Sequence, residues 1–138
     1  MGYNENMEKK ELTEWIKGLK NVTADSPFEE DFETLVFRHA QTRRWFGLWL
    51  KVPGKYLGEG AKNEFCLNLK CPPELAEMLR QNYKGILPAY HMNKEHWITV
   101  RLCADVPEEE IKNLIRLSYD LTSKREKSEK ANLGKTGM

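Results

Sequence analysis

The chain has 138 residues, the length of one ordinary domain, and 40% of them are hydrophobic. With 31% charged residues, this composition is typical of a soluble globular protein with a single core. No stretch approaches the roughly 18 apolar residues of a membrane helix. The start of the chain has no apolar run behind a basic tip, so we expect no signal peptide, no membrane partner and a cytoplasmic location.

The formal net charge of +1 hides an uneven distribution along the chain. Residues 1–35 carry a net charge of −5, whereas residues 36–70 carry +5. A local basic region suits an anionic partner better than the total charge does. The alternative is that opposite charges neutralise one another on the surface of one small domain.

The first element is expected to be a helix. Apolar residues at i, i+3, i+4 and i+7 predict an amphipathic helix over residues 7–20. Its apolar side is formed by Leu12, Trp15, Ile16 and Leu19, and its other face carries Glu8, Glu11 and Glu14. Residues 23–31, TADSPFEED, are expected to form a loop.

Strands are expected in the middle of the chain. Aromatic and β-branched residues predict strands over residues 33–40 and 44–52, joined by the turn QTRR. Residues 53–64, PGKYLGEGAKNE, contain three glycines and a proline and are expected to form a long hairpin loop, a wing. A third strand is expected over residues 65–70.

The remaining expected elements are a short helix over residues 72–83, a strand over 96–103 and a last helix with Asp105 as its N-cap. The buried stripe of the last helix is expected to be Ile111, Leu114, Ile115 and Leu121. We assign residues 1–125 to a single domain and expect residues 126–138 to be a disordered polar tail.

Alternate side chains of a strand point to opposite sides of a sheet, which divides each strand into two faces. One face is purely aliphatic or Phe and should meet the helices: Phe46, Leu48, Leu50, Val52, Phe65, Leu67, Leu69, Ile98, Val100 and Leu102. The other face mixes aromatic and polar residues: Trp45, Trp49, Lys51, Cys66, Asn68, Lys70, Trp97, Thr99 and Arg101. A sheet with helices on a single side would leave this second face open.

An open face of this kind suits nucleic acid, because aromatic rings stack on bases while Lys and Arg hold phosphates. Two alternatives stay open. Trp45, Trp49 and Trp97 could pack across strands as aromatic pairs, or they could be buried in a homodimer.

Two histidines lie close together in the segment GILPAYHMNKEHWITVRL, residues 85–102. On a helix, His91 and His96 would be about 140° apart, and on one strand they would point to opposite faces. They converge only if Asn93 and Lys94 form a two-residue hairpin turn, and a metal would still need a third ligand, for which only Glu95 is nearby. We therefore expect neither a metal nor another cofactor.

The sequence does not indicate catalysis. Ser118 has no partner histidine in view and interrupts the apolar stripe of its helix. The cysteines Cys66, Cys71 and Cys103 are an odd set without CxxC spacing, which indicates reduced thiols rather than disulfides or a zinc site. The segment PGKYLGEG lacks the spacing of a phosphate-binding loop. We expect a binding protein rather than an enzyme.

The order of these elements, with the motifs PAYHMNKEHW and LIRLSYDLT, resembles the MmcQ/YjbR-like family from about Glu8 to Thr122. The resemblance implies an α+β fold similar to that of bacterial frataxin, an antiparallel sheet with helices packed on one face. It also implies DNA binding through a double-wing arrangement.

Individual positions match the family pattern. Arg44 stands where the family usually has Lys before an aromatic residue, although RRW replaces the usual Gly-Lys here. Lys70 matches the basic residue that closes the third strand, Lys94 a basic residue of the turn, and Trp97 the first Trp of its strand. Ser118 and Tyr119 match the signature of the last helix, and we interpret them as packing residues.

Two functions follow from these observations. The first is a nucleic-acid-binding domain, a monomer or weak homodimer, with DNA as its expected partner and RNA as an alternative. Its candidate residues are Arg43, Arg44, Trp45, Trp49, Lys51, Lys55, Lys62, Lys70, Lys94, Trp97 and Arg101. The second is a protein-interaction or metal-delivery module that uses the acidic first helix with Glu5, Glu8, Glu11 and Glu14, although these residues also have the spacing of a solvated helix face.

Overall fold

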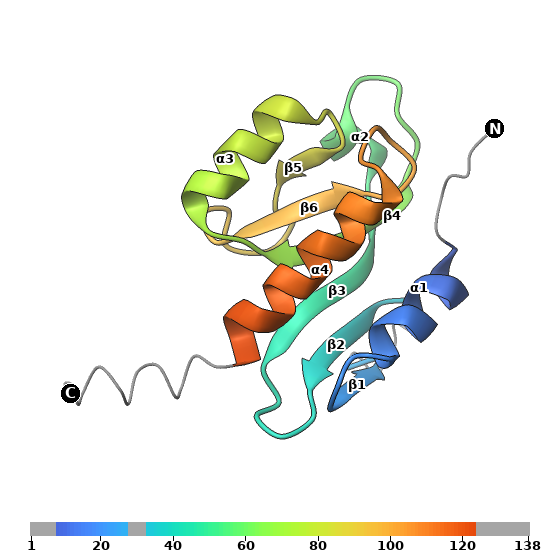
Figure 1. The fold of residues 1–138 in the computed structure, drawn as a ribbon. Helices are drawn as coiled ribbons and strands as arrows, with labels where there is room; N and C mark the ends of the chain where they lie inside the picture. The colour runs from blue at the N-terminus through green and yellow to red at the C-terminus, as the bar shows by residue number, and fades with distance from the viewer. Residues whose placement is uncertain (1–7, 28–32, 124–138) are drawn as a thin grey trace.

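A computed structural model, which describes residues 8–27 and 33–123, contains a six-stranded antiparallel sheet of order β1-β2-β3-β4-β6-β5 (Figure 1). The strands are β1 (Val22–Asp25), β2 (Leu35–His39), β3 (Trp45–Val52), β4 (Glu64–Lys70), β5 (Ile86–Pro88) and β6 (Trp97–Arg101). The helices are α1 (Lys9–Lys17), α2 (Gly54–Leu57), α3 (Pro73–Asn82) and α4 (Glu108–Ser123).

Helices α1, α3 and α4 pack on one face of the sheet, with α4 crossing β3 and β4 (Figure 1). The main core lies between them and joins Leu12 of α1, Leu79 of α3 and Ile115 of α4 to Leu67 and Val100 of the sheet. These aliphatic residues are at most 5% exposed. We call the opposite face of the sheet the second face.

The helices and strands predicted from the sequence are confirmed, with ends that differ by a few residues. Two short edge strands were missed: β1, part of which was expected to be a loop, and β5. They have only four and three residues, too few to show a clear alternation of apolar and polar side chains. The predicted wing contains the short helix α2, whose Leu57 is buried on the second face.

A β-bulge in β3 changes the assignment of its faces. Phe37 pairs with Gly47, but Arg38 pairs with Trp45, so Phe46 is an extra residue on β3. Phe46 belongs to the main core, and a side chain on Gly47 would contact Phe37 on the same side. Two consecutive residues therefore point toward the helices, and the alternation beyond them is shifted by one.

The bulge makes part of the face prediction wrong. Leu48, Leu50 and Val52, expected under the helices, form a second apolar cluster with Val36 and Cys66 on the other side. Trp49, expected on the open face, is in the main core instead. It is 6% exposed and stacks on Phe65 with a ring distance of 5.4 Å. The predicted faces of Trp45 and Phe46, and of β4 and β6, are correct.

Ser118 of helix α4, which is fully buried, forms hydrogen bonds to the backbone at the bulge. Its hydroxyl donates to the Phe46 carbonyl oxygen at 2.6 Å and accepts from the Lys70 amide at 2.9 Å. Thr122 is also buried, 2.8 Å from His39 Nε2, whereas Leu121 is only half-buried. Ser118 and Thr122 thus continue the buried stripe that was expected to include Leu121 and to be interrupted at Ser118.

Asp105 does not cap α4, which begins at Glu108. Its carboxylate accepts hydrogen bonds from the amides of Lys84 and Gly85 at 2.8 and 2.7 Å. Desolvation raises the pKa of Asp105, but hydrogen bonds from backbone amides, including those of Lys84 and Gly85, and the Lys84 charge together lower it below its usual value. Asp105 therefore stabilises the start of β5 rather than a helix end.

The described helices include none that is both long and apolar enough to span a lipid bilayer. The expected tail over residues 126–138 lies outside the described residues.

Candidate nucleic-acid interface

Residues 89–96, which we call the strap, run across the second face between β5 and β6. The Tyr90 amide donates to Thr99 Oγ1 at 2.8 Å, and Asn68 Nδ2 donates to the Tyr90 carbonyl oxygen at 2.9 Å. Thr99 and Asn68 are fully buried and are joined by a 2.6 Å hydrogen bond. Lys94 Nζ donates to the Ala89 carbonyl oxygen at 2.8 Å. The second face is therefore partly covered, not open as predicted.

The two histidines of the strap point to different places. His91 has a φ of 67°, a left-handed conformation that is uncommon outside glycine, and its ring lies 3.9 Å from the Tyr90 ring. His96 Nε2 lies 3.8 Å from Glu95 Oε1. Asn93 and Lys94 do not form the two-residue hairpin turn that would set the histidines opposite each other. Instead, Asn93 Oδ1 accepts hydrogen bonds from the amides of residues 95 and 96. Within residues 8–27 and 33–123, no three His, Cys, Asp or Glu side chains form a metal-ligand group.

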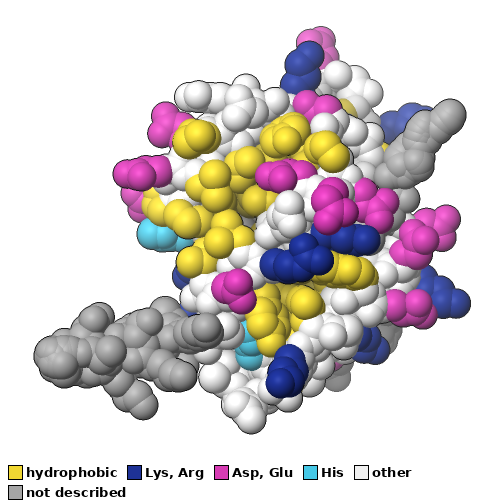
Figure 2. Space-filling model, viewed as in Figure 1, with side chains coloured by type: hydrophobic (Ala, Val, Ile, Leu, Met, Phe, Trp, Pro, Cys, Tyr) yellow, Lys and Arg dark blue, Asp and Glu magenta, His cyan; other side chains and the backbone are white. Residues whose placement is uncertain are grey.

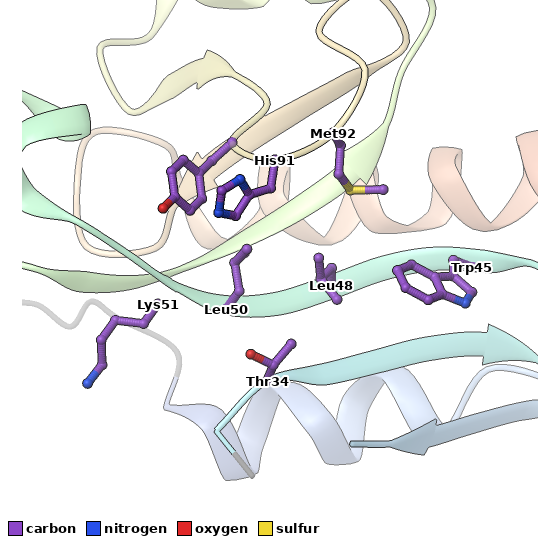
Figure 3. A pocket seen from close by; sticks show the side chains of 8 residues that line it. Thr34, Trp45, Leu48, Leu50, Lys51, His91 and Met92 are labelled. Carbon is purple, nitrogen blue, oxygen red and sulfur yellow. The ribbon is translucent and has the colours of Figure 1, made fainter. Parts of the chain in front are cut away.

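A groove with a volume of about 460 Å³ lies between the strap and strands β2 and β3. Its lining residues are Thr34, Trp45, Leu48, Leu50, Lys51, Tyr90, His91 and Met92. In Figure 3, Leu48 and Leu50 rise from β3 toward Met92 and His91, while Trp45 and Lys51 lie at opposite ends. The floor is apolar because the bulge turns Leu48 and Leu50 to this side.

Four residues at one end of the second face alternate between cation and ring across neighbouring strands: Arg38, Trp45, Lys70 and Trp97. We call them the cationic–aromatic row. The Arg38 guanidinium lies 5.7 Å from the Trp45 ring, and Lys70 Nζ lies 6.0 Å from the Trp97 ring. Arg38 also forms a salt bridge of 3.2 Å with Asp25. Four strands at about 4.8 Å spacing make the row roughly 14 Å long.

Arg43 and Arg44 extend this end of the sheet, because they lie in the turn directly before Trp45. Arg43 is exposed with a φ of 66°, and the half-buried Arg44 has an Nε atom that is buried without a hydrogen-bond partner. Of the eleven predicted residues, the structure gathers five here: Arg43, Arg44, Trp45, Lys70 and Trp97.

The other six predicted residues do not belong to this group. Lys55 and Lys62 are exposed at the far end of β3, about 24 Å from Trp45 at 3.4 Å per residue. At the same end, Arg101 forms hydrogen bonds of 2.9 and 3.0 Å with Glu64, which raise the Arg101 pKa.

Two further lysines and Trp49 are also not available on the predicted surface. Lys51 Nζ lies 3.5 Å from Glu33 Oε1 and over the Phe65 ring, and Lys94 is bound to the strap carbonyl of Ala89. Trp49 is buried under α1, where Lys9 Nζ is 5.9 Å from its ring.

Sequence reasoning missed two parts of this site. Arg38 was missed because the bulge determines that Trp45 is its cross-strand neighbour. Tyr90 and Met92 were quoted only as part of a motif, since nothing in their spacing shows that a loop folds back over the sheet.

The described helix side also brings cations to a tryptophan, with Lys112 Nζ 5.5 Å and the Arg116 guanidinium 5.0 Å from the Trp15 ring. On that face acidic and basic side chains are interspersed (Figure 2). The acidic residues Glu8, Glu11 and Glu14 of the first helix are exposed, but they share it with Lys9, Lys10 and Lys17. Glu5 lies outside the described residues. The arrangement is that of a solvated helix face with mixed charge.

Comparisons with known proteins identify relatives over most of the chain. The model of the YjbR family matches residues 17–121. "Uncharacterized protein YyaQ" of Bacillus subtilis is 39% identical over 117 residues, which are 84% of this chain and 98% of that protein. "Uncharacterized protein YjbR" of Escherichia coli K12 is 43% identical over 58 residues, 42% of this chain and 49% of that protein.

Solved structures share the fold. A crystal structure of a Pseudomonas syringae protein has a TM-score of 0.78 and 38% identity, covering 84% of this chain and 99% of that one. A Deinococcus radiodurans protein has a TM-score of 0.65 and 34% identity, covering 83% and 78% of the two chains.

Proposed function

The chain belongs to the YjbR family, and we propose that it binds nucleic acid along the cationic–aromatic row of the second face. The observation that carries the proposal is the register of that row, in which two half-buried tryptophans each have a cation within about 6 Å of the ring. Rings that alternate with cations match the chemistry of a strand of nucleic acid, where bases alternate with phosphates.

Trp45, Trp97 and Lys70 have definite roles in this proposal, whereas Arg38 is held by its salt bridge with Asp25. Trp45 and Trp97 are two strands apart, about 10 Å, so they would stack on different bases rather than enclose one. Lys70 lies between them and would contact the intervening phosphate. Arg43 and Arg44 would continue the phosphate path beyond Trp45.

The proposed binding surface is smaller than the one predicted from the sequence, which included the whole second face and the 53–64 wing. Arg101 is neutralised by Glu64, and the 53–64 segment lies at the opposite end of β3. Neither is needed for a strand that crosses the sheet at the bulge. Within residues 36–70, Arg38 is paired with Asp25 and Lys51 with Glu33, so part of that basic charge serves internal ion pairs.

The salt dependence of binding tests the proposal. Affinity for a mixed-sequence single strand should fall with salt, and Lys70→Gln should lower the slope by about 0.7, the value for one lost phosphate contact on a single strand. The loss should be similar for all sequences, because phosphate contacts carry little sequence information. Lys10→Gln, an exposed lysine of α1, is the matched control and should leave the slope unchanged. Weak non-specific binding should be visible at low salt with protein on the order of tens of micromolar. The proposal is wrong if wild-type protein at that concentration causes no mobility shift of duplex DNA, single-stranded DNA or RNA.

A further inference from the structure

The groove adjoining the row is held in shape by the strap. Tyr90 is fixed through both its amide and its carbonyl by the buried pair Thr99 and Asn68. Lys94 closes the strap on itself at Ala89. The groove is therefore formed before any ligand arrives, as small-ligand sites usually are.

His91 is held in an unfavourable backbone conformation at the edge of this groove. Its φ of 67° is accessible to glycine without strain but is uncommon for other residues. The ring is exposed and points toward Leu50 on the groove floor (Figure 3). Backbone strain of this kind clusters at ligand-binding sites, where the surrounding structure enforces it.

The chemistry of the lining suits a planar ring. Trp45 and the Tyr90–His91 ring pair supply aromatic walls, and Leu48 and Leu50 form an apolar floor. The groove volume of about 460 Å³ is within the range of typical small-ligand pockets, roughly 300 to 1,000 Å³. At one end of the groove the Arg38 guanidinium lies beside Trp45. At the other end the Lys51 ammonium turns away from the groove, to Glu33 and the Phe65 ring.

We infer that the groove receives one unpaired nucleobase of a bound single strand, stacked against the His91 ring above Leu50. This inference rests on the proposed function, because the strand enters the groove from the cationic–aromatic row through Trp45, which belongs to both. A base paired in a duplex cannot reach the groove without leaving its stack, which costs a few kcal/mol. The site would therefore favour single strands over duplexes.

The variants His91→Gly and His96→Gly test the inference as a matched pair. Glycine suits the backbone of His91, so His91→Gly removes the ring without adding strain. His96 is in the same strap but does not line the groove. We expect His91→Gly to weaken binding of a mixed-sequence single strand about fivefold or more, the loss of one stacked base, with duplex binding unchanged. His96→Gly should change neither, and one abasic position in the strand should weaken wild type but not His91→Gly.

The possible outcomes separate the groove from the row. If His91→Gly binds single strands as tightly as wild type while Lys70→Gln still flattens the salt dependence, the groove inference fails and the proposed function stands. If dTMP binds as tightly as the oligonucleotide and Lys70→Gln does not affect it, the groove is a small-molecule site and the inference is overturned. Absence of binding to any nucleic acid overturns both.

Discussion

The Ser118 hydroxyl donates a hydrogen bond to the Phe46 carbonyl oxygen at 2.6 Å, at the residue where β3 bulges. The same oxygen atom of Ser118 accepts the Lys70 amide of β4 at 2.9 Å. A bulge interrupts the regular pairing of backbone groups, and here a helix side chain binds two of them. Ser118 thus maintains the feature that places Trp45, Leu48 and Leu50 on the same face.

We expect Ser118→Ala to destabilise the fold by about 2 kcal/mol or more, because it leaves the buried Phe46 carbonyl without this donor and the part-buried Lys70 amide without this acceptor. Urea unfolding measures this difference. The control is Ser123→Ala at the end of α4, where the hydroxyl makes only a local bond to the Asp120 carbonyl oxygen. That variant should lose less than about 0.5 kcal/mol. Equal stability of the two variants would show that Ser118 does not support the bulge.

The bulge also explains which parts of the fold could be predicted. Alternation correctly assigned the faces of β4 and β6, which have no extra residue, and failed on β3 beyond Phe46. A signal was present in the sequence, since Gly47 lies inside a strand pattern and such glycines often mark a bulge. The bonds made by Ser118 and Asp105 could not be predicted, because they join segments far apart in the chain.

The strap should depend on Thr99. Thr99→Val keeps the shape of the side chain but leaves the Tyr90 amide and Asn68 Oδ1 without this partner. We expect a loss of about 2 kcal/mol, together with faster hydrogen exchange of the Tyr90 amide. Thr13→Val, a half-buried position of α1, should change neither quantity noticeably. Unchanged protection of the Tyr90 amide in Thr99→Val would contradict the proposed fixing of the strap.

The left-handed backbone of His91 should affect the stability of the fold. His91→Gly relieves the left-handed backbone, whereas His96→Gly only adds freedom to the unfolded chain. His91→Gly should therefore be more stable than His96→Gly by about 1 kcal/mol. Thermal unfolding of the two variants under identical conditions measures the difference. A greater loss in His91→Gly would mean that the imidazole itself stabilises the fold.

The carboxylate of Asp105 should stabilise the protein in a pH-dependent manner. Its pKa is lower in the folded state than the usual 3.8, so the charged form is favoured by folding. The contribution is fully present above about pH 5 and is lost as pH falls through the folded pKa. The stability gap between wild type and Asp105→Ala should hence be constant from pH 7 to about 5 and shrink below about 4. A gap that widens toward acid would reverse the assigned direction of the shift.

The candidate site was predictable only in part. Residue types and strand parity identified Lys70 and Trp97, which lie on regularly alternating strands, and Trp45, which precedes the bulge. The pairing of Arg101 with Glu64 was not predictable, since it depends on the register between β4 and β6. The groove was also not predictable, because it requires the path of the strap over the sheet.

The four tryptophans allow the central claim to be tested in one measurement. Trp45 and Trp97 are on the second face, whereas Trp15 and Trp49 pack on the helix side. Indole N–H resonances can be followed by NMR while a mixed-sequence single strand is titrated at low salt. The account predicts that the Trp45 and Trp97 signals move together and saturate, while those of Trp15 and Trp49 stay in place. Movement of Trp15 without Trp45 and Trp97, or no movement at all, would contradict binding at the cationic–aromatic row.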